Sequence, residues 1–265
     1  MAYLKNSISW FIRRTGFILF ADYLRYYFFL WRNFYKNKKF KNNHPDIAIP
    51  PDYLMYESFK LDYQRYYVGG KQTAEWIFNL TNQWLPKENG FILDWGCGPG
   101  RVIRHWPVKN YYGYASDVND KSIAWCRQFL PGVHFLNQQL IPPLPVDEQK
   151  FDFIYGISIL THLNEHSHFL WMEEFQRILK PGGLLLLTTQ GLSFKHKLTS
   201  REKRDFDQGK LIVRSAVKEG HRTFSSFQPV LFMEKLLHTF EVLKQIIAEG
   251  EENVQDVWIV RKIVN

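Results

Sequence analysis

The sequence of 265 residues predicts an α/β fold: a mostly parallel sheet with helices on both faces, an antiparallel C-terminal hairpin and an N-terminal helical extension. Three observations lead to this prediction. From residue 91 onward, strand-like apolar runs alternate with helical segments, as parallel sheets require. The last two runs are joined only by Glu249–Gln255, and so short a connection fits an antiparallel pair. The first 41 residues differ in composition from all that follow.

The formal net charge of +8 lies entirely within those 41 residues. They hold nine Lys and Arg, one acid and 14 of the 45 aromatic residues, whereas residues 42–265 hold 25 basic and 25 acidic residues. We predict one or two helices over residues 7–36, because aromatic residues recur at spacings of three, four and seven with basic residues opposite. The aromatic and apolar positions are Trp10, Phe17, Phe20, Leu24, Tyr27, Phe28, Trp31 and Tyr35, and the basic ones are Arg14, Arg25, Arg32 and Lys36. A polar linker over residues 36–51 is expected next, so we divide the chain into an arm with its linker, residues 1–45, and a domain, residues 46–265.

The domain begins with a helical segment, Tyr53–Leu85, for which we predict a break at Gly69-Gly70. Seven strands are then predicted, at Phe91–Trp95, Tyr111–Ala115, Val133–Leu136, Phe151–Ile157, Leu184–Thr189, Phe240–Ile247 and Val257–Val264. Helices between them are predicted at Lys121–Leu130, around His166–Leu179 and at Leu231–Thr239. Residues 191–227 interrupt this rhythm. They are polar and charged and show no clear period, so we expect an insertion or a lid there.

The composition excludes several classes of protein. At 45% hydrophobic and 23% charged residues the chain is globular rather than disordered. Two cysteines, Cys97 and Cys126, cannot form a disulfide framework or a four-thiolate zinc site, so we expect reduced thiols and no metal. The uncharged stretches of the arm fall short of the about 18 apolar residues of a transmembrane helix, and no signal-peptide cleavage pattern follows them. A helix that lies on a membrane is still compatible with the arm.

The strongest local signal is the glycine-rich turn LDWGCGPGR over Leu93–Arg101. A strand ends at Asp94 and Trp95, and glycines at 96, 98 and 100 let a ligand approach the backbone closely. A dinucleotide-binding turn would need the spacing G-x-G-x-x-G, and position 101 is Arg. A nicotinamide-dependent oxidoreductase is therefore the weakest of our hypotheses. An acid before this turn suits a ligand with a cationic or polar amino-acid end.

A second signal is Asp117, which stands at the end of the second strand and 21 residues after Gly96. A carboxylate there can accept hydrogen bonds from both hydroxyls of a ribose. Asp117 could instead be an ordinary helix N-cap, and Asp94 could cap its own turn. We favour ligand contact for both, because open α/β sheets bind ligands at the carboxyl ends of their strands.

Four motifs stand in order along the chain and together resemble those of class I S-adenosylmethionine-dependent methyltransferases. They are Asp94-x-Gly96-x-Gly98-x-Gly100, Asp117, Phe151–Ile154 and Arg177–Gly183. The resemblance covers about Tyr53–Lys262. The stretches Pro142–Pro145 and Ser158–Leu163 further resemble bacterial small-molecule methyltransferases. The resemblance implies a Rossmann-like seven-stranded sheet, S-adenosylmethionine as cofactor and methyl transfer as the reaction.

The resemblance also implies a role for each residue of the cofactor site. The turn would hold the methionine part, Asp117 the ribose and Val118 the adenine, with Asn137 or Gln138 at the adenine edge. The full predicted set is Asp94, Trp95, Gly96, Cys97, Gly98, Gly100, Asp117, Val118, Asn137, Gln138, Ile157 and Ser158. Many relatives have an Asp at this place after the third strand, where this chain has Asn137 and Gln138. From the residues alone, Trp95 is core or pocket wall and Cys97 a small residue in a tight turn, while Lys180–Gly183 leads structurally into the fifth strand.

An oxygen acceptor would also need a base, and His162 and His221 are the candidates. Each has a structural alternative, His162 as a buried helix-start histidine and His221 as a solvated loop histidine. No Asn/Asp-Pro-Pro-Tyr/Phe motif follows the fourth strand, where the sequence is Gly156-Ile157-Ser158-Ile159, and no double-glutamate acceptor loop is present. A small-molecule or lipid- or sugar-linked acceptor is therefore expected.

The arm has three interpretations. It could lie on an anionic membrane surface, pack on the domain or a partner chain, or bind nucleic acid, which we place well below the other two. The sequence thus predicts a cytoplasmic methyltransferase, with a peripheral position at the inner face of the membrane. The alternative is a non-catalytic, membrane-docked binding protein that keeps the methyltransferase fold.

Overall fold

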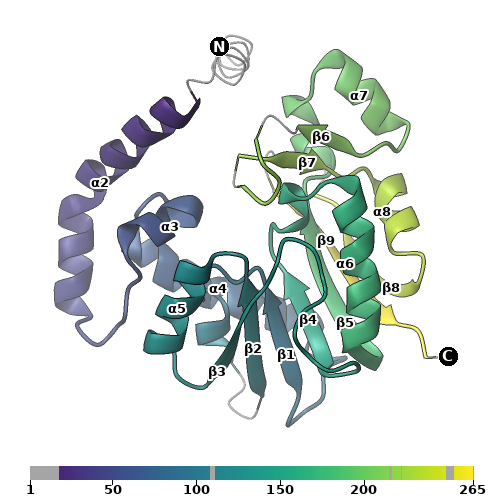
Figure 1. Ribbon diagram of the computed structural model, residues 1–265, viewed down its shortest axis with the longest axis horizontal. Coiled ribbons are helices and arrows are strands. Elements are labelled where there is room, and N and C mark those ends of the chain that lie inside the picture. The colour runs from purple at the N-terminus through teal and green to yellow at the C-terminus, as the bar shows by residue number, and fades with distance from the viewer. Residues whose placement is uncertain (1–17, 108–110, 215–216, 222, 249–253, 265) are drawn as a thin grey trace. The chain divides into compact units, whose positions relative to one another are not determined.

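The computed structural model describes residues 18–107, 111–214, 217–221, 223–248 and 254–264 (Figure 1). The start of the helix predicted over residues 7–36 and most of the turn Glu249–Gln255 lie outside these residues. The chain forms two compact units, Met1–Gln72 and Thr73–Asn265, and their boundary falls inside helix α4 (Tyr63–Thr81). Our functional division at residues 45 and 46 stays a prediction.

The second unit is built on a seven-stranded sheet in the order β3-β2-β1-β4-β5-β9-β8. Its strands are β1 (Phe91–Trp95), β2 (Tyr112–Asp117), β3 (Val133–Asn137), β4 (Phe151–Gly156), β5 (Leu179–Thr189), β8 (Phe240–Ile246) and β9 (Asp256–Lys262). The first five are parallel to one another, and β9 runs antiparallel to both β5 and β8. The predicted mostly parallel sheet with an antiparallel C-terminal hairpin is confirmed.

Helices cover both faces of this sheet (Figure 1). The principal ones are α5 (Asp120–Phe129), α6 (Glu165–Ile178) and α8 (Val230–Leu236), with short 3-10 turns η1 (Ile103–His105) and η2 (Leu160–His162). Successive side chains of a strand point to opposite faces. Ile154 of β4 therefore packs in the core that includes Met233 of α8, whereas the Tyr155 ring stacks on Trp106 at 5.8 Å on the other face. Trp106 in turn meets Phe78 of α4 edge-on.

Residues 191–227 form regular structure. They contain η3 (Leu192–Lys197), α7 (Ser200–Asp207), β6 (Ile212–Arg214) and β7 (Ser225–Phe227), and the two strands make a small antiparallel sheet of their own. Thr199 and Glu202 form a capping box at the start of α7, and the Glu202 carboxylate also pairs with Arg214 at 2.7 Å. Five buried side chains make a separate core, Phe194, Leu198, Phe206, Ile212 and Phe227. The expected insertion is therefore a small subdomain.

Lys180–Gly183, which we predicted to lead into the fifth strand, is already part of strand β5. Helix α6 ends at Ile178, and Leu179 already pairs with Phe151 of β4 before a register shift. The Lys180 ammonium lies 2.7 Å from the Asp152 carboxylate, which also accepts the Phe91 backbone N–H at 2.8 Å. Two of the four motifs that carried the resemblance thus hold strands β1, β4 and β5 together.

In the first unit, helix α2 (Ile18–Asn43) packs against the segment that joins two further helices, α3 (Asp52–Phe59) and α4. The predicted linker over residues 36–51 was wrong in its first part, because α2 continues through Lys36–Lys41 to Asn43. Pro45 is the first strong helix breaker after it. Helix α2 is thus an integral part of this unit.

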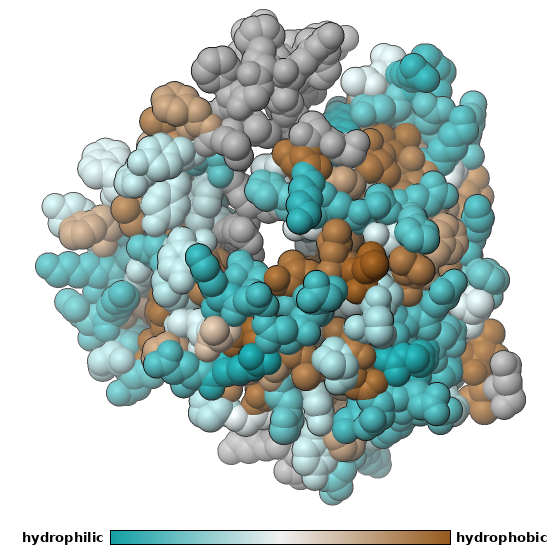
Figure 2. All heavy atoms as spheres, viewed as in Figure 1, coloured by the Kyte–Doolittle hydropathy of each residue, from teal (hydrophilic) through white to brown (hydrophobic). Residues whose placement is uncertain are grey.

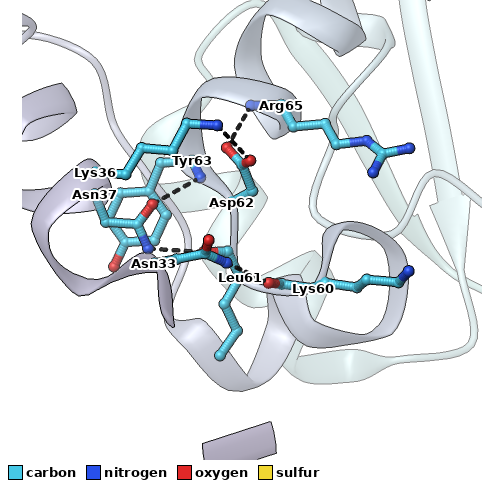
Figure 3. A network of polar contacts seen from close by, with 8 residues as sticks. All are labelled: Asn33, Lys36, Asn37, Lys60, Leu61, Asp62, Tyr63 and Arg65. Carbon is cyan, nitrogen blue, oxygen red and sulfur yellow. Dashed lines mark hydrogen bonds and ion pairs between the residues drawn. The ribbon is translucent and has the colours of Figure 1, made fainter. Parts of the chain in front are cut away.

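The predicted break at Gly69-Gly70 was also wrong, since both glycines lie inside α4. The chain breaks at Lys60 and Leu61, which have positive φ angles of 50° and 59°. Side chains of α2 bind the backbone there (Figure 3). Asn33 donates to the Lys60 carbonyl at 2.8 Å, and Asn37 donates to the Leu61 carbonyl at 2.7 Å and accepts the Tyr63 N–H at 3.1 Å. The break is therefore stabilised by contacts from a distant helix.

The buried Asn37 amide gives a stability prediction. Asn37→Ala removes both of its hydrogen bonds and leaves the Leu61 carbonyl and the Tyr63 N–H without that partner. We expect the free energy of unfolding, measured by urea denaturation, to fall by about 2 kcal/mol. Asn42→Ala, at an exposed position of the same helix, is the control. Equal losses in the two variants would contradict the prediction.

Candidate active site

The predicted cofactor residues gather at one edge of the sheet. Strands β1 to β4 are parallel neighbours, so their carboxyl ends meet at the same edge. The glycine turn follows β1, Asp117 ends β2, Asn137 ends β3 and Ser158 follows β4. The topology therefore brings together residues that lie up to 64 positions apart in the sequence.

The glycine turn is held against two neighbouring segments. The backbone N–H groups of Gly96 and Cys97 both donate to the Ser116 carbonyl, at 2.8 and 2.9 Å. Gly96 has a φ of 76°, and a Cβ there would lie 2.1 Å from Ile159 Cδ1. A larger residue at position 96 would have to displace the Ile159 side chain and would hold a backbone conformation unfavourable for a residue with a Cβ. A Cβ on Gly98 would instead meet nothing within 4 Å, so the turn is open on that side.

Asp117 connects this turn with the start of helix α5. Its Oδ2 accepts the Gly98 N–H at 2.7 Å, and its Oδ1 accepts the Asn119 N–H at 2.8 Å. Burial raises the pKa of the Asp117 carboxyl, and these backbone donors partly offset the rise. The N-cap of α5 is Asn119 and not Asp117, because the Asn119 side chain accepts the Lys121 and Ser122 N–H groups. Asp117 thus organises the turn while it stays partly exposed.

Asp94 lies beneath the turn and is only 4% exposed. Burial raises the pKa of its carboxyl to about 7, against the favourable influence of Tyr155 and Arg101 on the charged form. The Tyr155 hydroxyl lies close by but outside hydrogen-bond geometry, and Asp94 Oδ2 has no hydrogen-bond partner among the described residues. Arg101 is itself anchored to Thr73 of α4 at 2.8 Å. Sequence reasoning missed Tyr155 and used Arg101 only to exclude a dinucleotide.

The residues predicted for the adenine differ in their surroundings. Val118 is 45% exposed, as a surface for a planar ring would be. Gln138 is 7% exposed, and its Oε1 has no partner among the described side chains and backbone. Asn137 is exposed and donates to Asp120. Gln138 is therefore the better of the two predicted partners for a ligand donor group.

Two of the predicted site residues, Trp95 and Cys97, are buried in the interior. The Trp95 side chain is fully buried and packs on Trp171 and Phe175, with ring centroids 4.8 and 4.9 Å apart. Only its backbone can therefore face the turn. Burial raises the pKa of the Cys97 thiol well above its usual value, and the nearby carboxylates of Asp117 and Asp94 raise it further. A thiol in this state is a poor nucleophile.

The segment after β4 has a strained backbone at Ser158, and hydrogen bonds to other parts of the chain hold it in place. Ser158, which follows Ile157, has a φ of 64°, unusual for a residue with a side chain. Its N–H donates to Thr188 Oγ1 at 2.8 Å, and its Oγ donates to Gln255 Oε1 at 2.7 Å. Strain of this kind collects at functional sites where the surroundings enforce it. Gln255 lies 97 residues further along the chain, so no local pattern could have pointed to it.

His162 lies at the end of η2, on the edge that carries the glycine turn. Its Nδ1 lies 3.1 Å from the Phe224 carbonyl, and because a carbonyl only accepts, Nδ1 carries the proton. Nε2 then has the lone pair and no hydrogen-bond partner among the described residues. Burial lowers the pKa of His162, and the nearby His221 lowers it further, while the Phe224 carbonyl acts in the opposite direction. His162 is therefore neutral at pH 7, with its basic nitrogen directed away from Phe224.

Residues 219–228 hold η2 in this position. Glu219 accepts the Asn164 N–H at 2.8 Å, and Gly220 N–H donates to the His162 carbonyl at 3.0 Å. Ser226 and Gln228 both donate to the Leu160 carbonyl. His221 itself is exposed and contacts Thr223, at 2.8 Å. The structure thus brings the two predicted histidines near each other, but only His162 is bound to a carbonyl and largely shielded from solvent, whereas His221 is exposed.

Comparisons with known proteins point to the same kind of enzyme domain. A family model described as a methyltransferase domain matches residues 93–187. Malonyl-[acyl-carrier protein] O-methyltransferase of Enterobacter lignolyticus is 29% identical over 98 residues, which are 37% of this chain and 38% of that protein. The tRNA U34 carboxymethyltransferase of Pseudoalteromonas atlantica is 30% identical over 108 residues, 38% of this chain and 32% of that protein. The chain thus spans less than two fifths of these curated relatives.

Solved structures show the same fold. A S-adenosylmethionine-dependent methyltransferase of Methanosarcina mazei has a TM-score of 0.54 at 20% identity, covering 70% of this chain and 98% of its own. The magnesium protoporphyrin IX methyltransferase of Synechocystis, solved with bound S-adenosylhomocysteine, has a TM-score of 0.54 at 13% identity, covering 88% and 98%. Residues 93–187 thus match a methyltransferase domain, and the sheet has the fold of S-adenosylmethionine-dependent methyltransferases. The family and the cofactor that the sequence predicted are confirmed.

The residues present fit that cofactor. The open side of Gly98 leaves room beside the backbone, and Asp117 offers carboxylate oxygens for a diol. Gln138 Oε1 is a buried acceptor without a partner in the described part of the chain, which suits an amino group of a base. The individual assignments of these residues to parts of the cofactor stay predictions.

The buried Asp94 carboxyl predicts a pH-dependent stability. Its pKa is about 7 in the folded protein and near 3.8 when unfolded, so the folded state holds the proton more tightly. The stability that this proton provides is complete below pH about 4 and is lost as the pH rises to about 7. Asp94→Asn stays neutral throughout. As the pH rises between these values, we expect the unfolding free energy of Asp94→Asn to increase relative to that of the wild type by a few kcal/mol.

Urea denaturation of the unliganded protein at a series of pH values measures this gain. Asp147→Asn, at an exposed position, controls for the loss of one carboxylate. A difference between Asp94→Asn and the wild type that is the same at pH 4 and pH 7 would show that Asp94 is not buried as described.

Proposed function

We propose that the protein transfers a methyl group from S-adenosylmethionine to a small-molecule or lipid- or sugar-linked acceptor, at a membrane surface. The observation that carries the proposal is the site at the carboxyl edge of the sheet, where the open glycine turn, Asp117 and the oriented His162 lie at or just after the ends of neighbouring strands. The curated relatives act on an acyl-carrier-linked substrate and on tRNA, so the likeness alone leaves the acceptor open.

The subdomain over residues 191–227 favours an acceptor with an anionic group. It holds nine basic and four acidic residues. Three of the acids are engaged in ion pairs, Glu202 with Arg214, Asp205 with Lys210 and Asp207 with Lys195. Glu219 is bound to Asn164. The remaining cations give this subdomain an excess of positive charge beside η2, which would attract a carboxylate or a phosphate-linked acceptor.

For a hydroxyl acceptor we propose His162 as the general base. When bound, the cofactor supplies the methyl group and a neutral thioether as leaving group. His162 Nε2 takes the hydroxyl proton as the new carbon–oxygen bond forms and the sulfur–methyl bond breaks. The Phe224 carbonyl holds the proton on Nδ1 and so keeps Nε2 as the acceptor. His221, exposed and bound to Thr223, is proposed as an accessory group near the acceptor.

Incubation of the protein with a cell extract and methyl-labelled S-adenosylmethionine tests the activity. We expect a labelled product with the wild type and at least a tenfold weaker affinity for S-adenosylhomocysteine in Asp117→Ala, measured by calorimetry. Asp147→Ala is the matched control at an exposed position. Binding of S-adenosylhomocysteine without any labelled product would favour the non-catalytic alternative, and undiminished binding by Asp117→Ala would refute the assigned site.

A second experiment addresses the base. His162→Asn places an amide nitrogen where Nδ1 lies, so it can still donate to the Phe224 carbonyl, but it has no basic nitrogen. We expect transfer to a hydroxyl acceptor to slow by about 10²-fold or more, with S-adenosylhomocysteine affinity unchanged. Because burial lowers the pKa of His162, the wild-type rate should decline only at a pH below the ordinary pKa of histidine, and the variant should lose that decline. His166→Gln, at an exposed position of α6, is the control. A parallel pH profile in His162→Asn would leave His162 with a structural role only.

A further inference from the structure

One side of helix α2 packs on the rest of its unit. Asn33, Lys36 and Asn37 bind the backbone and Asp62 at the α3–α4 junction, and Phe40 lies in the small core with Leu61. These contacts use a single side of the helix. They explain why α2 is part of a compact unit, but they do not account for most of its aromatic residues.

A second side of α2 exposes large aromatic side chains to solvent. Its members are Phe20, Tyr23, Leu24, Tyr27, Phe28, Trp31, Phe34 and Tyr35, which we call the outer stripe. At 100° per residue they fall within about 140° of the helix circumference. Trp31 is 78% exposed and Tyr35 82%. In Figure 2 hydrophobic and near-neutral side chains lie along α2, on the left of the view, beside hydrophilic ones. An exposed aromatic surface of this extent marks an interaction site.

Basic residues border the outer stripe. Arg25, Arg32 and Lys39 follow one edge of the stripe, between it and the packed face, and Lys38 and Lys41 extend the charge at the C-terminal end. All five are exposed. The one acid of α2, Asp22, accepts a hydrogen bond from Tyr56 at 2.8 Å. The surface around the stripe is therefore cationic, and its partner should be anionic.

We propose that the outer stripe of α2 docks the protein on an anionic lipid bilayer. An interfacial helix combines an aromatic or apolar face with Lys and Arg beside it, and Trp and Tyr are the residues favoured at the lipid–water boundary. Among the described residues no helix is long and apolar enough to cross a membrane, so α2 would lie in the plane of the surface. The stripe holds one aliphatic residue among eight, which does not suit a coiled-coil seam with a second copy.

This inference rests on the proposed function in one respect, because a lipid-linked acceptor would be reached at that surface. The docking itself uses no residue of the cofactor site. Asn33 and Asn37 hold α2 from the opposite side, so the stripe can be changed without touching the packed face. Deleting the arm, by contrast, would remove these contacts as well and would confuse docking with folding.

The test is cosedimentation of the full-length protein with vesicles. We expect binding to phosphatidylcholine vesicles that contain phosphatidylglycerol, little binding to phosphatidylcholine alone, and weaker binding as salt rises. Phe28→Ser with Trp31→Ser should weaken binding at least tenfold. Trp76→Ser, at an exposed tryptophan of α4, should leave binding unchanged. Arg32→Glu with Lys39→Glu should weaken it, whereas Lys87→Glu with Lys244→Glu, an equal change of charge at exposed positions elsewhere, should have a much smaller effect.

Four outcomes would overturn the proposal. They are equal binding to both vesicle types, no binding to either, equal losses in the stripe and control variants, and displacement of the vesicles by an oligonucleotide. A dimer that Phe28→Ser with Trp31→Ser converts to a monomer would assign the stripe to a second copy instead. All variants should keep their affinity for S-adenosylhomocysteine, so a failure of docking is distinct from a failure of the proposed function.

Discussion

The Asp117 carboxylate is the contact on which the site depends. Its two oxygens accept backbone N–H groups from the turn after β1 and from the start of α5, so one side chain joins two strand ends. The turn is also limited by Gly96, where even a methyl group would strike Ile159. Between these constraints the side above Gly98 is open. The space for a ligand is thus set by backbone geometry, and Asp117 can serve the turn and a bound diol with the same oxygens.

The sheet could be predicted because its signals are local. Each strand is an apolar run bounded by turn residues, and the order of strands and helices implies the parallel arrangement. The errors occur where long-range contacts decide the structure. Lys60 and Leu61 adopt positive φ angles because Asn33 and Asn37 bind their carbonyls from 27 and 24 residues away. A pair of adjacent glycines looked like the better break, but within α4 the helix tolerates them.

The sequence motifs predicted the part of the candidate site that depends on backbone geometry. The glycine turn and Asp117 lie where the spacing placed them. The side chains that tune the site were not accessible to that reasoning. Tyr155 meets Asp94 only through strand register, Gln255 reaches Ser158 from the antiparallel strand region, and the Phe224 carbonyl fixes the His162 tautomer from 62 residues away. The spacing of the motifs therefore predicts where the site lies, whereas tertiary packing determines the protonation states of Asp94 and His162.

The aromatic residues of α2 serve two different physical needs. Phe40 is buried with Leu61, where its area is removed from water as in any core. Trp31 and Tyr35 are mostly exposed, and leaving such large rings in water is unfavourable unless another surface covers them. A helix that only packed on its unit would need apolar residues on one side. An interfacial helix without a protein contact would need no buried asparagine. Since α2 has both, it is anchored on one side and available on another, and the cationic border specifies what the available side can bind.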